Sequence, residues 1–190
     1  MRRGSGSLTN TEPKALPEAE LLQAINDRQQ ITDLIYRYCR AVDRLDLRLG
    51  YSVWHEDGLA DYEAFYSGTG RGAIDLICAQ HQRLLVHSHQ ISNIIIELDG
   101  ERAGSESYVT ATLRLRDGER LKQMMVWSRY IDRWSRRNGR WGIDKRVAVR
   151  DFDEVREVVA MSLPLGGKRD SSDPSYDVLG NGRGNTQPCS

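Results

Sequence analysis

Hydrophobic residues recur at steps of three and four positions along the first part of the chain, the spacing of one face of an α-helix. Pro17, Glu18 and Glu20 are typical of a first helical turn, where proline is tolerated and acids meet the positive end of the dipole. The pattern predicts one long amphipathic helix from Pro17 to about Asp43. Its recurring positions are Leu21, Leu22, Ile25, Ile31, Leu34, Ile35, Tyr38 and Val42.

Shorter elements follow this helix. We expect a second helix over residues 47–54, which the polar run at residues 55–58 ends. Alternation over residues 59–66 predicts a strand, and Ser and Gly residues at 67–70 break it. Apolar residues at helical spacing then predict a third helix over residues 73–85.

From Val86 to about Val149 the pattern changes to four long strands rich in Ile, Val, Thr, Tyr and Trp. Helices followed by a long antiparallel meander predict the α+β class, with helices on one face of the sheet. Strands of this length must coil strongly, so we expect a cone or half-barrel. The strands are separated by three strong hairpin signals, Asp99-Gly100, Asp117-Gly118 and Asn138-Gly139.

The two ends of the chain differ in composition from this domain. Residues 1–16 and 165–190 are rich in Gly, Ser, Asn, Pro and Asp, and their few apolar residues cannot offset the entropy of ordering. We therefore expect two disordered tails around one folded domain over residues 17–164. A short helix near residues 155–165 that closes the mouth of the cone or covers a partner is an alternative for the boundary.

Charge and composition restrict the partners. Lys plus Arg and Asp plus Glu both number 27, so no global field favours nucleic acid or an anionic membrane. The chain shows no signal peptide or membrane span, and we expect a cytoplasmic protein that binds a small molecule. Cys39, Cys78 and Cys189 form no CxxC pair that would indicate zinc, a redox centre or a disulfide framework. We expect Cys39 and Cys78 to be buried free thiols.

Asp43 is the first residue with possible chemistry. A carboxylate in the last turn of a helix faces the negative end of the dipole, which raises its proton affinity. Helical spacing places Asp43 above Cys39 and Tyr36, towards the interior. The alternative is a solvated terminal acid that pairs with Arg40 or Arg44.

Histidines supply the second candidate. Alternation in the strand after the third helix places His87, His89, Ile91, Asn93 and Ile95 on one face. An imidazole there is either a satisfied core histidine or a general base, because it titrates near neutrality. A metal site at the His-x-His pair would need a third ligand from His55, His81 or an acid, and none of them has a spacing typical of a metal site.

Aromatic and sulfur side chains of the meander are a weaker signal. Met125 and Trp127 in the third strand either line a ligand pocket or belong to the ordinary core. The basic and aromatic run at residues 133–141 straddles a hairpin, so we interpret it as a solvated tip and not as a nucleic-acid site.

Three motifs together resemble a known family. Residues 38–46 (YCRAVDRLD), 54–57 (WHED) and 89–93 (HQISN) resemble the SnoaL-like branch of the nuclear-transport-factor-2-like superfamily, which includes scytalone dehydratase and hexachlorocyclohexane dehydrochlorinase. The resemblance covers about residues 20–150 and implies a cystatin-like α+β cone with an internal pocket. In those lyases a histidine removes a proton and an aspartate orients it, which implies His89 and Asp43 as the catalytic pair.

The resemblance implies a cofactor-independent lyase or isomerase that acts on a small, largely apolar cyclic or polyketide-like compound, with no metal. Tyr36, Tyr38 or Tyr62 would donate a hydrogen bond to the substrate, and Asn93 would share the pocket. The alternative is a non-catalytic ligand-binding domain, or a structural subunit like the small subunit of ring-hydroxylating dioxygenases. In either case the resemblance implies a homo-oligomer, a trimer first and otherwise a dimer.

Overall fold

The computed structural model describes residues 17–160 and 163–179. The tail expected over residues 1–16 and the last part of the tail expected after residue 165 lie outside the described residues. Among the residues that are described, no helix is both long and apolar enough to cross a membrane.

The long N-terminal helix α1 spans Glu18–Arg44. It ends at Leu45, whose left-handed backbone (φ 53°) lets its amide reach back to the carbonyls of Ala41 and Val42. Helix α2 (Leu47–Ser52) begins directly afterwards, because the Asp46 side chain accepts a hydrogen bond from the Leu49 amide at 2.9 Å. Ile31, Ile35, Tyr38 and Val42 of its apolar face are buried, as the periodicity predicts. Leu21, Leu22 and Ile25, in the first turns, are exposed.

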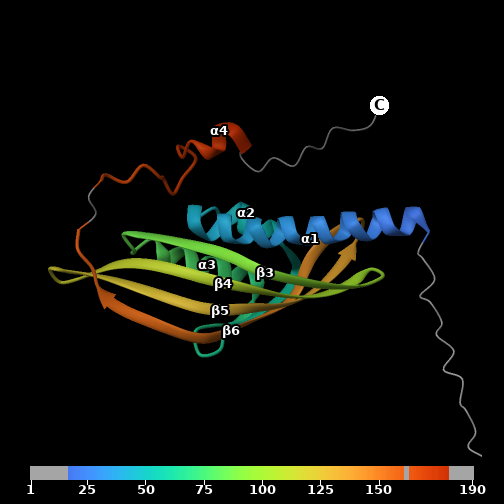
Figure 1. Ribbon diagram of the computed structural model, residues 1–190, viewed down its shortest axis with the longest axis horizontal. Helices are drawn as coiled ribbons and strands as arrows, with labels where there is room; N and C mark the ends of the chain where they lie inside the picture. Colours follow the sequence, from blue (N-terminus) through green and yellow to red (C-terminus); the bar gives the residue numbers. More distant parts are fainter. Residues whose placement is uncertain (1–16, 161–162, 180–190) are drawn as a thin grey trace, which may run out of the picture.

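Six strands form one curved, unclosed sheet in the order β2-β1-β6-β5-β4-β3. All neighbouring strands are antiparallel except β1 and β6, which are parallel. The sheet curves beneath α1 in Figure 1, with α2 and α3 beside it. The α+β prediction is therefore confirmed. The elements are β1 (Trp54–Asp61), β2 (Ser67–Thr69), α3 (Gly70–His81), β3 (Val86–Asp99), β4 (Arg102–Asp117), β5 (Arg120–Arg137) and β6 (Arg140–Glu157).

All three predicted hairpins are present. Gly100, Gly118 and Gly139 have φ values of 57°, 60° and 75°, which only glycine adopts without cost. Asn138 also has a positive φ, so the β5–β6 connection has two left-handed central residues, as a two-residue turn with the strand twist requires. These turns fix the register of the meander.

The short elements were predicted less well. Residues 55–58 do not end a helix but belong to β1, and the strand expected over residues 59–66 ends at Asp61. Gly58 explains the difference, because a Cβ there would lie 2.6 Å from the Ile143 carbonyl oxygen. Glycine thus lets β1 approach β6 where their register shifts. At the other end of the sheet, β6 continues to Glu157, so no helix begins at residue 155.

The described C-terminal segment, residues 163–179, also differs from expectation. It includes α4 (Ser175–Leu179) and packs over the side of the molecule that carries α1 and α2 (Figure 1). Arg169 donates to the carbonyls of His81 and Leu84, and Tyr176 donates to Asp46. Composition predicted a disordered tail here. It could not reveal these polar contacts, because they join residues that lie 85 or more positions apart.

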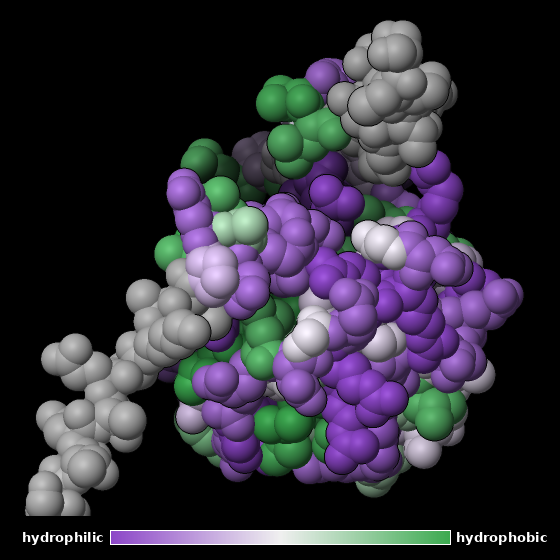
Figure 2. Space-filling view, turned by 90° about the vertical axis from the view of Figure 1, so that its right-hand side faces the viewer, coloured by the Kyte–Doolittle hydropathy of each residue, from purple (hydrophilic) through white to green (hydrophobic). Residues whose placement is uncertain are grey.

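The surface at the other end of α1 is mostly hydrophilic. Figure 2 shows this end, where α1 begins and the β3–β4 hairpin turns. Arg136 there donates to Asp27 at 2.7 Å and to both carboxylate oxygens of Glu101. This end is held by charged contacts, although Leu21, Leu22 and Ile25 at the start of α1 are exposed.

A fully buried ion pair lies at the centre of the fold. Arg146 on β6 donates through Nε and Nη2 to the two carboxylate oxygens of Asp132 on β5, each at 2.7 Å, and neither side chain is exposed. The guanidinium lies 4.2 Å from the ring centroid of Tyr38 and 4.0 Å from that of Tyr130. Burial disfavours the charge of Arg146, but Asp132 outweighs it and holds the pKa well above its ordinary value.

We predict that Asp132→Ala lowers the free energy of unfolding by about 3–5 kcal/mol, because it leaves the Arg146 charge buried without a counterion. Urea unfolding measures this change. Glu157→Ala is the control, because it removes an exposed pair with Arg120 and should cost at most about 1 kcal/mol. Equal effects of the two substitutions would contradict the central role of the buried pair.

Candidate active site

Asp43 and His89 meet where the last turn of α1 crosses β3. The Asp43 Oδ1 atom lies 2.7 Å from His89 Nδ1, and Oδ2 accepts the His89 backbone amide at 3.0 Å. Both side chains are largely buried, with 15% of Asp43 and 8% of His89 exposed. β3 is an edge strand, so the His89 amide is free of the ladder and available to the carboxylate.

This contact fixes the state of the imidazole. A carboxylate only accepts hydrogen bonds, so His89 Nδ1 carries the proton and donates it. In the neutral ring Nε2 is then unprotonated and able to take a proton. The two bonds from one residue also hold the carboxylate in place, so the orientation of the ring is set by the backbone of β3 and the end of α1.

Two further histidines surround His89. The His81 ring stacks on His89 with centroids 5.4 Å apart and lies 4.5 Å from the His87 ring. His87 Nε2 donates to the Val42 carbonyl at 3.0 Å. Burial lowers the pKa of His87, and burial together with His89, His87 and Arg169 lowers that of His81 to about 3. Both rings are therefore neutral at physiological pH.

The histidines do not form a metal site in the structure. No group of three or more His, Cys, Asp or Glu residues within the described ranges could hold a metal ion. His55, considered as a third ligand, is buried elsewhere, with its Nε2 2.9 Å from the Ser135 carbonyl and Arg140 near its Nδ1.

A pocket of about 280 Å³ adjoins the pair. Tyr36 lines it, which agrees with the helical spacing that places Asp43 above Cys39 and Tyr36. Burial raises the pKa of the Cys39 thiol to about 12, so it is protonated and a poor nucleophile near neutrality. The lining residues are Tyr36, Cys39, Arg40, Asp43, Arg44, His89 and Ile91.

The other two tyrosines belong to the central ion-pair cluster. The hydroxyls of Tyr38 and Tyr62 lie 2.5 Å apart, and burial raises the pKa of both. Tyr38 and Tyr130 pack edge to face with centroids 5.5 Å apart. Neither Tyr38 nor Tyr62 lines the pocket beside His89, so of the three tyrosines only Tyr36 does.

Three further sequence-predicted site residues, Asn93, Met125 and Trp127, also lie away from this pocket. Pairing of β4 with β5 places Met125 opposite Thr112 and Trp127 opposite Thr110, on the sheet face opposite to His89 and its partner Ala111. Trp127 instead stacks on Phe152 with centroids 4.6 Å apart. The expectation that both line the same space as His89 is wrong, because strand parity sends them outward.

Asn93 lies away from the pocket for a different reason. It has a positive φ of 48° in a bulge between Ser92 and Ile95, where two residues of β3 oppose one of β4. The bulge reverses the alternation, so Ile94 and Ile96 face the core while Asn93 and Ile95 are exposed. The bulge could not be predicted from the hydrophobic pattern, because consecutive Ile residues in β3 fit either alternation.

Sequence reasoning also missed residues that the structure brings to the site. The sequence suggested His81 only as a possible metal ligand and Arg40 only as a possible ion-pair partner of Asp43. It gave no role to Asp132 or Arg146, which form the central ion pair. Alternation with the inward Trp134 would have marked Asp132 as buried. No local signal shows that His81, at the end of α3, stacks on His89.

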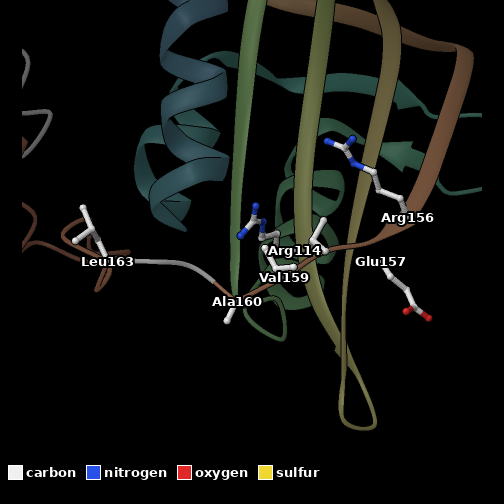
Figure 3. Close-up of a pocket in the computed structure, with 7 residues that line it drawn as sticks. Arg114, Arg156, Glu157, Val159, Ala160 and Leu163 are labelled. Atoms are coloured by element: carbon white, nitrogen blue, oxygen red, sulfur yellow. The ribbon is translucent and has the colours of Figure 1, made fainter.

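A larger hollow of about 540 Å³ lies at the end of β6 (Figure 3). None of the sequence-predicted site residues lines it. Arg114 and Arg156 approach it from β4 and β6, and Val159, Ala160 and Leu163 complete its wall. Glu157 is the carboxylate among its lining residues, and none of these residues is a histidine.

The curved sheet, the helices on one face and the inward histidine agree with the nuclear-transport-factor-2-like superfamily that the motifs resemble. Residues 23–147 match the family described as SnoaL-like domain. The match spans well over half of the 190 residues, so the chain belongs to the SnoaL-like domain family, and the resemblance seen in its motifs is confirmed. No curated protein matches the chain.

Solved structures show the same fold. Hexachlorocyclohexane dehydrochlorinase LinA-type3 from Novosphingobium barchaimii LL02 has a TM-score of 0.67 and 20% identity, covering 75% of this chain and 99% of its own. A putative scytalone dehydratase from Novosphingobium aromaticivorans DSM 12444 has a TM-score of 0.63 and 19% identity, covering 76% and 99%. A protein of unknown function with a cystatin-like fold from Nostoc punctiforme PCC 73102 has a TM-score of 0.54 and 21% identity, covering 66% and 91%.

The histidine cluster predicts how stability depends on pH. The unfolded chain protonates histidine near pH 6.5, whereas the folded state holds His81 neutral to about pH 3. Between these values the unfolded state binds more protons, so stability is complete above pH 6.5 and falls as the pH is lowered. His81→Gln should remove up to about 1.4 kcal/mol per pH unit of this slope, measured by urea unfolding between pH 7 and 4.

Arg83→Gln is the control for this measurement, because Arg83 is exposed just after α3 and does not titrate in this range. It should keep the wild-type slope. An unchanged slope in His81→Gln would show that His81 is protonated in the folded protein.

Proposed function

We propose that the chain is a cofactor-independent lyase or isomerase that acts on a small, largely apolar cyclic or polyketide-like compound, with His89 as the base and Asp43 as its positioning partner. The observation that carries the proposal is the 2.7 Å contact between His89 Nδ1 and Asp43 Oδ1 beside a pocket of ligand size. The neighbours named as a dehydrochlorinase and a putative scytalone dehydratase support the same class of reaction.

In the proposed elimination, His89 Nε2 takes a proton from a carbon of the substrate. The electron pair of that C–H bond forms the new double bond, and the leaving group departs from the adjacent carbon with its bonding pair. Asp43 stabilises the imidazolium that results. The imidazolium then returns its proton to the leaving group or to water. In an isomerisation it returns the proton to another carbon of the substrate.

The pKa shifts of the surrounding groups support His89 as the only base of the cluster. Burial keeps His81 and His87 neutral, and a neighbour held neutral adds no positive charge that would oppose protonation of His89. The Nε2 atom of His87 donates a hydrogen bond to the Val42 carbonyl and is therefore not available as a base. Of the described histidines, His89 is the one whose ring contacts a carboxylate, that of Asp43.

We also propose that the protein is a homo-oligomer, a trimer first and otherwise a dimer, and that it works in the cytoplasm. The family resemblance supports the first point, and the expectation from the sequence supports the second. The non-catalytic alternative, a ligand-binding or structural subunit, would use the same fold without turnover.

We predict that His89→Ala lowers turnover roughly 10²–10⁴-fold, the range for loss of a general base. Asp43→Asn should lose most of the activity, because an amide no longer stabilises the imidazolium. The double substitution should be little worse than His89→Ala, since the two act as one unit. Single-turnover kinetics on scytalone, hexachlorocyclohexane and related small elimination substrates measure all three variants.

Two controls separate catalysis from folding. Asp33→Asn changes another carboxylate of α1, which accepts from Gln29, and should leave turnover unchanged. Asp43→Asn should shift the melting temperature little, because the amide oxygen still accepts the His89 backbone N–H. Wild-type turnover by His89→Ala would overturn the assignment. Absence of turnover in a folded wild-type chain that still binds these compounds would favour the non-catalytic alternative.

A further inference from the structure

Arg40 lines the same pocket as the His89–Asp43 pair. It lies three residues before Asp43 on α1, so the two side chains leave the helix on neighbouring positions of one face. A cation beside a general base is notable because it disfavours protonation of the base unless something negative lies between them.

The partners of Arg40 are neutral. Its Nη1 donates to the Ser175 hydroxyl at 2.9 Å, and its guanidinium lies 4.7 Å from the centroid of the Tyr176 ring. Within residues 17–160 and 163–179, no carboxylate lies within ion-pair distance of it. Arg44, the other cation of the pocket, is paired with Asp173 at 3.5 Å, and Asp43 gives both oxygens to His89.

One donor of Arg40 is also unsatisfied. Its Nη2 is shielded from solvent and has no hydrogen-bond partner among the described residues. A shielded N–H of a cation without an acceptor costs free energy, which an acceptor oxygen in the pocket would recover. Charge and hydrogen bonding therefore point to the same missing group, an oxygen that carries negative charge.

We propose that Arg40 binds an anionic oxygen of the substrate. This oxygen belongs either to a permanent carboxylate or to a carbonyl that becomes an enolate when His89 removes the neighbouring proton. The inference rests on the proposed function and narrows its substrate class from a largely apolar compound to an apolar ring with such an oxygen. Ser175 and Tyr176 of the C-terminal segment hold the guanidinium in position.

In the enolate case the electrons balance without another reactant. The C–H proton moves to His89 Nε2, the C–H pair forms a carbon–carbon double bond, and the carbonyl π pair moves to oxygen, where Arg40 donates to it. Collapse of the enolate restores the carbonyl and either expels the leaving group from the β-carbon or takes the proton back at carbon.

Binding of two matched probes to the full chain tests the carboxylate form. We expect 2-naphthoate to bind at least about tenfold more tightly than its uncharged amide, 2-naphthamide, because a charged acceptor strengthens the hydrogen bond to a guanidinium. Arg40→Met should remove this preference, and Arg40→Lys should keep part of it. Arg37→Met should keep all of it, since Arg37 is exposed on α1 and does not line this pocket.

The enolate form is tested with 2-naphthol, whose fluorescence reports its ionisation. Bound 2-naphthol should ionise at a lower pH than free 2-naphthol, and Arg40→Met should abolish this shift. A carboxylate preference alone assigns a carboxylate substrate, and an ionisation shift alone assigns an enolate.

Ser175→Ala covers the case in which Arg40→Met loosens the C-terminal segment. It keeps the guanidinium but removes its hydroxyl partner, together with the Ser175 bond to Asp173, so it should weaken either signal severalfold. Absence of both signals in the wild type, or their persistence in Arg40→Met, overturns the inference. His89→Ala should keep the carboxylate preference, so a failure of the catalytic proposal and a failure of this one are distinguishable.

Discussion

The buried charge of Arg146 is the constraint on which the interior depends. A guanidinium without solvent must keep its counterion, and the bidentate contact to Asp132 ties β6 to β5 at the centre of the sheet. Its flat faces meet Tyr38 and Tyr130, which brings α1 down onto the same point. The strands and the long helix are thus held together at the centre of the fold by this polar cluster.

The position of this cluster explains where the His89–Asp43 pair and its pocket lie. The centre beneath α1 is filled by Arg146 and aromatic rings, so the pocket lies where α1 ends over the edge strand β3. There the His89 ring and the His89 amide, which is not used by the sheet, both bond to Asp43. An edge strand usually exposes its donors to water, and here a carboxylate from the end of a helix occupies one of them.

The C-terminal segment adds a second layer to this site. Its polar residues reach the ends of α1 and α3, pairing Arg44 with Asp173 and placing Ser175 and Tyr176 against Arg40. The C-terminal segment treats the two arginines of the pocket differently. Arg44 is neutralised by Asp173, whereas Arg40 is held by the neutral side chains of Ser175 and Tyr176. Arg40, unlike Arg44, therefore has no carboxylate partner among the described residues, and it lines the same pocket as His89.

The sequence by itself determined the elements with long periods and strong turns. The apolar face of α1 and the three glycine hairpins depend on local spacing and backbone freedom. The alternation that places His87, His89 and Ile91 on one face of β3 is also local, and it holds up to the bulge. The motifs also marked Asp43 and His89 as a pair. Only the tertiary structure decided the rest, because it depends on contacts between distant residues. The bulge at Asn93 and the parity of β5 removed Asn93, Met125 and Trp127 from the pocket, and the packing of α3 and the C-terminal segment brought in His81 and Arg40.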